Sequence, residues 1–337
     1  MYRSILLPLD GSALAERAIP LAAGLAAASG ALLHVVVVHK WLASWSPVNP
    51  FALTLDEIDA QARREKEAYL QRVADDIAQH YDLTVRPAMP EGFTVEQLAQ
   101  YVRANGVDLV VMTTHGRGGF SRHWFGSVAD RLLRTLTVPV LLCRAGPAGA
   151  PEPAVPFRRI LVSLDGSTLA ETALAAAEPL ARMAGDGRLH LCMVVEPAHL
   201  FLPAVAVSGG LLEELGEAER REYAAAYLQL LALRLARRSV TAETSVVAGD
   251  DPAAAILEMA ERVGADLIAL ATRGRGGAAR AVFGSVADKV MRTAQVPVLV
   301  THPSPRAARL APAYSRAIEQ RRRDTAADAT ASAAGAR

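Results

Sequence analysis

The sequence is poor in several features that would mark particular classes of protein. It has two cysteines, Cys143 and Cys192, among 337 residues, and 5% of its residues are aromatic. Two cysteines in separate apolar runs do not make a disulfide framework, so we predict two buried, reduced thiols. The 36 Lys and Arg residues nearly cancel the 35 Asp and Glu residues, which gives a net charge of +1. That balance argues against nucleic acid or an anionic membrane as a partner.

Long apolar runs are also missing. The longest candidate, residues 21–38, is interrupted by Gly24, Ser29, Gly30 and His34. The chain opens with YRSILLPLD, which lacks the successive basic and apolar regions of a secretory signal peptide. We therefore expect a cytoplasmic protein without a membrane partner. The 51% hydrophobic content, much of it alanine, favours helices packed closely on sheets.

What the chain does contain is a repeat of domain size. The segment ILLPLDGSALAE, from Ile5, returns as ILVSLDGSTLAE from Ile160, and FGSVADRLLRTLTVPVLL returns as FGSVADKVMRTAQVPVLV. Asp10 recurs 155 residues later as Asp165, a period too long for a solenoid repeat. We predict domains at residues 1–144 and 158–303, a linker rich in Pro, Ala and Gly at 145–157, and a disordered tail at 304–337.

Each repeat alternates short apolar runs with helical segments. The runs SILLPL, LLHVVVV, LTVRPA, DLVVMTT and VPVLLC of the first repeat are apolar throughout, which is typical of parallel strands covered on both faces. Five such strands per repeat predict an α/β fold of two doubly wound domains. Each would be a five-stranded parallel sheet of order 3-2-1-4-5 with helices on both faces. Pro20 and Pro179 should each kink or restart a helix.

A glycine-rich loop follows the fourth strand of each repeat. It reads THGRGGFSRHWFGS from Thr114 and TRGRGGAARAVFGS from Thr272. In a doubly wound sheet, ligands bind beyond the carboxyl ends of the strands, here between the first and fourth. Glycines, and the free N–H groups where the next helix begins, suit a phosphate. The alternative is purely structural: a turn, followed by capping boxes at Ser127–Asp130 and Ser285–Asp288.

Two better-known phosphate loops do not match. A Walker loop ends in Gly-Lys-Ser/Thr, whereas no lysine precedes Ser127 or Ser285. A dinucleotide fingerprint follows the first strand and has a third glycine, which these loops lack. Acidic residues in the first helical turn, Asp130 and Asp288, would repel a phosphate. A divalent cation or an arginine of the loop (Arg117 and Arg275) would have to offset their charge, and we therefore predict that Mg²⁺ accompanies the phosphate.

Together these motifs resemble those of the universal stress protein family. The resemblance rests on LDGS after the first strand, Gly116 separated by nine residues from Gly126-Ser127, and the following GSVAD and VPVLL, all repeated in the second half. It extends from Arg3 to His302. It implies five-stranded parallel sheets and ATP binding without vigorous catalysis. It also implies pairing of the last strands, here as a pseudo-dimer within one chain, and leaves a homodimer open.

The resemblance also implies matching binding residues in the two repeats. Those of the first would be Pro8, Leu9, Asp10, Val35 and Met112 around the adenosine, and Gly116, Gly126, Ser127 and Val128 around ribose and phosphates. Those of the second would be Asp165, Val194, Leu270, Gly274, Gly284, Ser285 and Val286. Both loops lack one glycine that the family usually has, and the second departs further because Ser163 stands in place of Pro8.

Three functions remain open at this point. We predict first an ATP-binding regulator or sensor of the stress response that acts through a protein partner. The alternative is a slow ATPase or nucleotide hydrolase, for which His115 is the candidate base, although Arg273 replaces it in the second repeat. In the third, the loops have lost their ligand and the protein acts through its surfaces alone.

Overall fold

The computed structural model describes residues 1–40, 52–114, 126–144, 156–196, 217–272 and 284–302, with side chains in the first long helix from residue 57 onward. The described elements of the first half are, in chain order, β1 (Ser4–Leu9), α1 (Ala13–Glu16), α2 (Ile19–Ser29), β2 (Leu32–Val37), α3 (Ala52–Tyr81), β3 (Val85–Ala88), α4 (Thr94–Ala104), β4 (Leu109–Thr113), α5 (Ser127–Thr135) and β5 (Val140–Cys143). Those of the second half are β6 (Arg159–Leu164), α6 (Glu171–Met183), β7 (Arg188–Val195), α7 (Glu217–Ala236), β8 (Thr241–Ala248), α8 (Pro252–Arg262), β9 (Leu267–Ala271), α9 (Ser285–Thr293) and β10 (Val298–Thr301).

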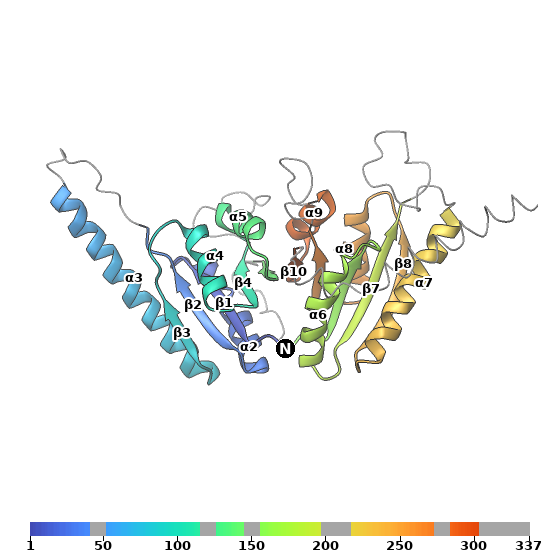
Figure 1. Ribbon diagram of the computed structural model, residues 1–337, viewed down its shortest axis with the longest axis horizontal. Coiled ribbons are helices and arrows are strands. Elements are labelled where there is room, and N and C mark those ends of the chain that lie inside the picture. The colour runs from blue at the N-terminus through green and yellow to red at the C-terminus, as the bar shows by residue number, and fades with distance from the viewer. Residues whose placement is uncertain (41–51, 115–125, 145–155, 197–216, 273–283, 303–337) are drawn as a thin grey trace, which may run out of the picture.

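The strands form one continuous sheet of order β3-β2-β1-β4-β5-β10-β9-β6-β7-β8. Each half therefore has the predicted order 3-2-1-4-5 with parallel neighbours, which confirms the doubly wound fold. The halves meet where β5 pairs with β10 in the antiparallel sense, with Leu141 opposite Leu299. Figure 1 shows the result: the two domains lie side by side, with α3 and α7 at the outer ends. The predicted intramolecular pseudo-dimer is thus formed by the last strand of each domain.

Helices cover both faces because the strands are apolar on both faces. Alternate residues of β1 separate cleanly: Leu7 belongs to one hydrophobic core and Leu6 to the other. The first core lies under α2, α3, α6 and α7, and the second under α4, α5, α8 and α9. Each core runs through both domains without a break. The two halves therefore share their buried interior as well as their sheet.

The two helical prolines behave differently. Pro20 lies in the first turn of α2, after a break that separates α2 from α1, so the predicted restart is confirmed. Pro179 lies inside α6, which continues to Met183, so no restart occurs there. Proline removes the hydrogen bond to the carbonyl one turn back, that of Ala175. Ala175 is exposed, so water can replace the lost donor.

Contacts across the join tie the domains together. The Tyr2 hydroxyl donates to the Ala176 carbonyl at 2.9 Å, and Arg144 donates to the Thr293 and Ala294 carbonyls at 3.3 Å each. Phe157, which the sequence analysis assigned to the linker, is 1% exposed and belongs to the first core. Within the described ranges, no helix combines the length and apolar character that crossing a membrane requires.

Both cysteines are free and buried, as predicted. Burial raises the pKa of Cys143 to about 12 and that of Cys192 to about 11. Both are therefore thiols near neutral pH, and a thiol is far less nucleophilic than a thiolate.

Candidate functional site

The repeated Asp-Gly-Ser segment forms a tight turn beyond the carboxyl end of β1. Gly11 has φ of 77°, a left-handed conformation that favours glycine. The Asp10 carboxylate accepts a hydrogen bond from the Ser12 N–H at 2.9 Å, and the Ser12 hydroxyl accepts one from the Ala15 N–H at 3.1 Å. The second domain repeats the turn after β6 at the same lengths, with Asp165, Gly166, Ser167 and Ala170. The turn fixes an exposed aspartate at the end of the first strand of each domain.

Helices α5 and α9 begin at Ser127 and Ser285, as predicted, but without the predicted capping boxes. Gly126 and Gly284 occupy the cap positions, and no side chain caps either helix. The serines are already the first helical residues, so they are one position too late to serve as caps. The first N–H groups of each helix therefore have no side-chain acceptor, which is the arrangement that binds anions.

The acidic residues of the first turn pair within their own helices. Asp130 accepts hydrogen bonds from Arg134 at 2.8 and 3.0 Å, and Asp288 accepts them from Arg292 at 2.7 and 2.8 Å. These bonds raise the pKa of both arginines, and the aspartate of the other domain adds to the effect in each case. The repulsion of phosphate that suggested Mg²⁺ is therefore largely offset by arginines. Arg117 and Arg275, the other candidates for this role, lie outside the described residues.

A cavity of about 520 Å³ opens between β6, β9 and the start of α9. Six of the seven residues predicted for the second domain line it: Asp165, Val194, Leu270, Gly284, Ser285 and Val286. The seventh, Gly274, lies outside the described residues. The sequence analysis missed Glu196, Pro252, Ile256 and Thr272, which also line the cavity. Glu196 and Thr272 directly follow β7 and β9, and Pro252 and Ile256 lie in the first turns of α8, the helix after β8, so the topology was the signal that could have found them.

In the first domain, most of the predicted residues occupy corresponding positions. Pro8 and Leu9 end β1, and Asp10 follows. Met112 of β4 matches Leu270 of β9, because β1 pairs Leu6 with Val110 and β6 pairs Leu161 with Ile268. Gly126, Ser127 and Val128 begin α5 as Gly284, Ser285 and Val286 begin α9. Gly116 lies outside the described residues.

Val35 does not correspond to Val194, which corrects the prediction. Leu6 pairs with His34 of β2, and its equivalent Leu161 pairs with His190 of β7. Counting from these histidines, the equivalent of Val194 is Val38, three residues beyond Val35. Val35 is fully buried in the first core, whereas Val38 and Val194 both pack against the second. Val35 thus lies on the opposite face of the sheet from the cavity.

The second-domain cavity is lined by two carboxylates and by the start of a helix. The Asp165 and Glu196 side chains belong to the strand ends, and the uncapped start of α9 carries the positive end of the helix dipole. Thr272 shares a 2.7 Å hydrogen bond with His302 Nδ1, and burial lowers the pKa of His302 to about 4. This imidazole is neutral near pH 7. In the described part of the chain, no cluster of three or more His, Cys, Asp or Glu side chains could hold a metal ion.

Neither the backbone conformation nor the described surroundings of Gly284 explain why this residue is a glycine. Its φ of −51° and ψ of 144° are accessible to any residue. A Cβ placed there would meet no atom of the described residues within 4 Å. Neither backbone strain nor a contact with the described residues requires glycine, so on that side there is room for a group that lies against the main chain. Gly126 has nearly the same conformation, with φ of −56° and ψ of 141°.

The fold is that of a doubly wound α/β protein, and in this class the topological switch point, where this cavity lies next to an uncapped helix, is the usual place for a ligand. A model of the universal stress protein family matches this chain twice, at residues 1–144 and 156–302. The chain belongs to the universal stress protein family.

Relatives with two such halves align along nearly their whole length. A universal stress protein of Mycolicibacterium smegmatis is 27% identical over 306 residues, covering 89% of this chain and 97% of that protein. One of Mycobacterium tuberculosis is 28% identical over 303 residues with the same coverage. Among solved structures, a universal stress protein from Archaeoglobus fulgidus gives a TM-score of 0.63 at 21% identity, covering 90% of this chain and 97% of that one. At that identity, the likeness shows the fold alone.

Proposed function

We propose that each domain binds ATP at the start of α5 or α9, and that the protein is a nucleotide-dependent regulator or sensor of the stress response. One observation carries the proposal: Gly284 faces open space at an uncapped helix start, inside a cavity of about 520 Å³. That volume falls within the range of small-molecule sites, roughly 300–1,000 Å³. A phosphate is the group that uses free main-chain N–H groups and needs the absence of a Cβ.

The charges around the cavity favour one orientation of the nucleotide, with its phosphates at the start of α9. The triphosphate would lie against the N–H groups of Ser285 and Val286. The Asp165 carboxylate, an acceptor fixed by its turn, would accept hydrogen bonds from ribose hydroxyl groups. Val194 and Leu270 would contact the base from the apolar wall. The opposite direction would place phosphates beside Asp165 and Glu196, where like charges repel.

The first domain would bind in the same way. Asp10, Met112, Gly126, Ser127 and Val128 would supply the contacts, with Pro8 and Leu9 forming the wall. Gly116 and Gly274, in the loops, complete the proposed phosphate contacts. We place Val38 rather than Val35 at the adenosine, because Val38 is the structural counterpart of Val194.

Magnesium would arrive with the triphosphate. Because Arg134 and Arg292 already pair with the aspartates, the helices do not need a metal ion to tolerate phosphate. We therefore propose that Mg²⁺ tightens binding without being required for it. A general base works best with a pKa near the working pH, and His302 at about 4 is far from it. His115, the candidate base of the sequence analysis, lies outside the described residues. We favour binding that changes how a protein partner is recognised, with slow ATP hydrolysis as the alternative.

The test is calorimetric titration of the full chain with ATP, with and without Mg²⁺. We expect two sites in the unaltered protein. Gly126→Ala and Gly284→Ala should each remove one of them, because the new methyl group occupies the place of a phosphate oxygen. Thermal melting without nucleotide should change little, since the alanine fits both backbones. Two sites in either variant would refute the proposed phosphate position, and no site in the unaltered protein would refute ATP binding altogether.

A further inference from the structure

The two domains differ in the side chains that lie between one pair of neighbouring helices. In the first domain the pair is α1–α2 and α3, and in the second it is α6 and α7. The sequences of α3 and α7 match at AYLQ, so Tyr69 corresponds to Tyr227 and Asp76 to Arg234. The burial pattern agrees, because Leu70 and Ile77 are buried like their equivalents Leu228 and Leu235. Glu16, at the end of α1, corresponds to Glu171, at the start of α6. The same glutamate and the same tyrosine thus face opposite charges.

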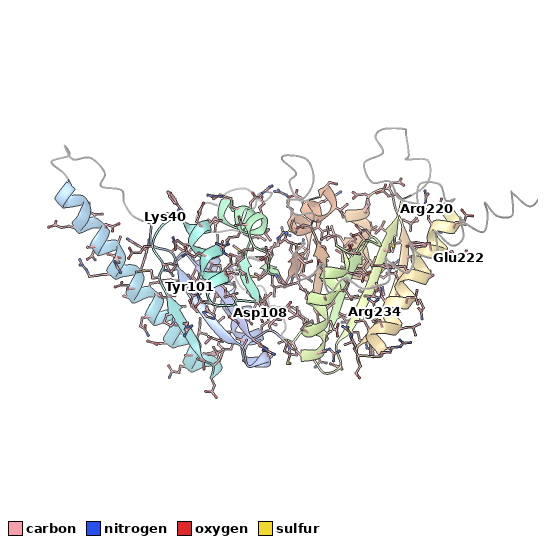
Figure 2. The ribbon with its side chains drawn as sticks, viewed as in Figure 1. Lys40, Tyr101, Asp108, Arg220, Glu222 and Arg234 are labelled. Atoms are coloured by element: carbon pink, nitrogen blue, oxygen red, sulfur yellow. The ribbon has the colours of Figure 1, made fainter. Side chains whose placement is uncertain are left out.

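In the second domain, the glutamate holds a guanidinium group. Arg234 Nη1 lies 3.5 Å from Glu171 Oε2, and the Tyr227 hydroxyl donates to Glu171 Oε1 at 3.3 Å. Glu171 is buried, with 3% of its side chain exposed. Figure 2 shows where Arg234 lies on α7. This arrangement demonstrates, within the same chain, what the glutamate–tyrosine pair can bind.

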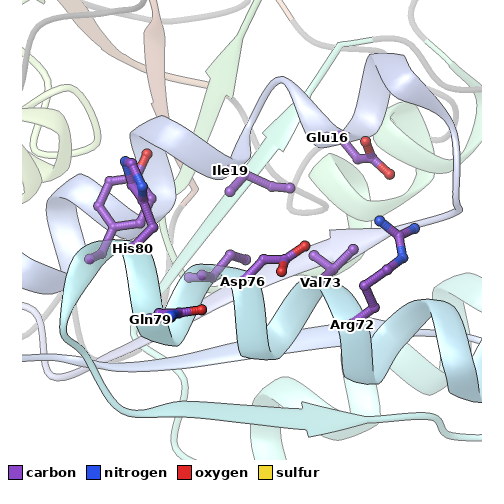
Figure 3. Close-up of a pocket in the computed structure, with 9 residues that line it drawn as sticks. Glu16, Ile19, Arg72, Val73, Asp76, Gln79 and His80 are labelled. Carbon is purple, nitrogen blue, oxygen red and sulfur yellow. The ribbon is translucent and has the colours of Figure 1, made fainter.

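In the first domain, the same place is hollow. A cavity of about 700 Å³ lies between the helices, lined by Glu16, Ile19, Arg72, Val73, Asp76, Ile77, Gln79, His80 and Tyr81. Glu16, Arg72 and Asp76 point into the space between the helices (Figure 3). Asp76 forms neither a hydrogen bond nor an ion pair with any described residue. The Tyr69 hydroxyl group faces Glu16, as that of Tyr227 faces Glu171: burial and the nearby Glu16 carboxylate raise the pKa of Tyr69.

Arg72 does not replace the missing group. Its guanidinium carbon lies 5.6 Å from the centre of the Tyr69 ring, and it makes no salt bridge with either carboxylate in the described structure. Its counterpart on α7 is Leu230. His80, at the far end of the cavity, is exposed. Two carboxylates thus line a cavity together with an arginine that forms a salt bridge with neither of them.

We propose that the cavity between α1–α2 and α3 binds a guanidinium group from outside the chain, held by Glu16 and Asp76 as Arg234 is held by Glu171. The group is either an arginine side chain of a partner protein or a free small guanidinium compound. Planar guanidinium groups pair with carboxylates in a fixed geometry and stack on aromatic rings. The site is separate from the proposed nucleotide cavities and does not depend on them.

The test is titration of the full chain with N-acetylarginine methylamide at low salt, followed by the amide NMR signals of α3. The matched control is the citrulline analogue, which has the same shape without the charge. We expect saturable 1:1 binding of the arginine compound, and binding of the citrulline compound weaker by about tenfold or more, which corresponds to ~1.4 kcal/mol. Added salt should weaken the binding, because the site is open to solvent. Equal binding of the two compounds, or no saturation, would overturn the proposal.

Three variants at exposed positions sharpen the result. Asp76→Arg supplies the guanidinium group from within and should abolish binding, whereas Asp76→Asn should weaken it while keeping the shape. Arg72→Leu, which copies the second domain, removes a competing positive charge and should tighten binding. Agmatine, a free guanidinium compound, separates the sources: tighter binding than the arginine compound indicates a small molecule, and weaker binding indicates a side chain. Unchanged affinity in both Asp76 variants would contradict the site.

Discussion

The two domains are alike at the proposed nucleotide sites. They differ at the helix pair that covers one face of the sheet, which is α1–α2 with α3 in the first domain and α6 with α7 in the second. Both have the same strand order, the same Asp-Gly-Ser turn and the same uncapped helix start. Between the first and third helical segments, one domain buries Glu171 against Arg234, and the other leaves Glu16 and Asp76 at an open cavity. The features that both copies keep are those of the strand ends. The difference marks a surface where the copies can serve separate purposes.

The join between the domains should be the most sensitive place in the molecule. Leu141 and Leu299 lie opposite each other on β5 and β10 and are fully buried. Leu141→Ala and Leu299→Ala should each lower the free energy of unfolding by about 2–5 kcal/mol, because each leaves a cavity in a shared core. Urea denaturation measures both. Strongly unequal costs would show that the two halves do not share the join evenly.

The buried ion pair of the second domain should also be costly to break. Arg234→Ala leaves Glu171 buried without its cation and should lower the free energy of unfolding by about 2 kcal/mol. The matched change Asp76→Ala, on the exposed equivalent, should change it by less than about 0.5 kcal/mol. Equal losses in the two variants would contradict the difference that we describe between the helix pairs.

Arg234→Ala should also change how the free energy of unfolding depends on pH. Burial raises the pKa of Glu171 above its ordinary value of 4.5, and Arg234 opposes that rise. A carboxyl group whose pKa is raised on folding binds more protons when folded, so it costs stability above that pKa and costs nothing below the ordinary value. Without Arg234 the pKa rises further. The loss in Arg234→Ala should therefore be largest near neutral pH and shrink toward pH 4.5; a constant loss would be inconsistent with this reason.

Two glycines of the second domain should respond in opposite ways to alanine. Gly166 has φ of 80°, so Gly166→Ala should lower the free energy of unfolding by roughly 1–2 kcal/mol through backbone strain. Gly284 has an ordinary conformation and open space, so Gly284→Ala should be neutral or stabilise by up to about 1 kcal/mol. Thermal melts of the two variants give the comparison. A destabilised Gly284→Ala would mean that the glycine serves the fold rather than a ligand.

The smallest expected effect concerns a single hydrogen bond between the domains. Tyr2→Phe removes the donor to the Ala176 carbonyl and should cost about 1 kcal/mol. Hydrogen exchange of the α6 amides should speed up, although the change is made in the other domain. Tyr101→Phe, whose partner His34 is in the same domain, is the control and should leave α6 unchanged. Faster exchange of α6 in both variants would point to a general loosening instead.

Much of the fold could be predicted from local patterns. The run SILLPL coincides with β1, and RILVSL with β6, because a buried parallel strand is apolar throughout and ends at a polar turn. Pro20 predicted a helix restart correctly because the position fell in a first turn. Pro179 did not restart its helix, because the Ala175 carbonyl that loses its donor is exposed to water. That exposure depends on tertiary packing, which the local sequence does not reveal.

The predictions that were wrong or missing depended on strand register, on the exact start of a helix, and on contacts between residues far apart in the sequence. In LLHVVVV both faces are apolar, so a shift along β2 leaves the pattern unchanged, and Val35 was matched to Val194 in place of Val38. The predicted capping boxes were wrong by one position, because each helix has its glycine, and not its serine, at the cap. Both glycine and serine are common cap residues, so the Gly-Ser sequence alone does not tell which of them takes that position. The cavity beside α3 has Asp76 where the second domain has Arg234, and this reversal of charge gains meaning only once the structure places Glu16 on the same cavity.

The most direct test of the central claim is to follow the backbone amide signals of the full chain by NMR during a titration with ATP. We predict that the amides of residues 127–129 and 285–287 shift together and saturate at two equivalents, because phosphates lie against both helix starts. A titration in which neither set of amides moves would contradict the account, whatever else in the spectrum changes.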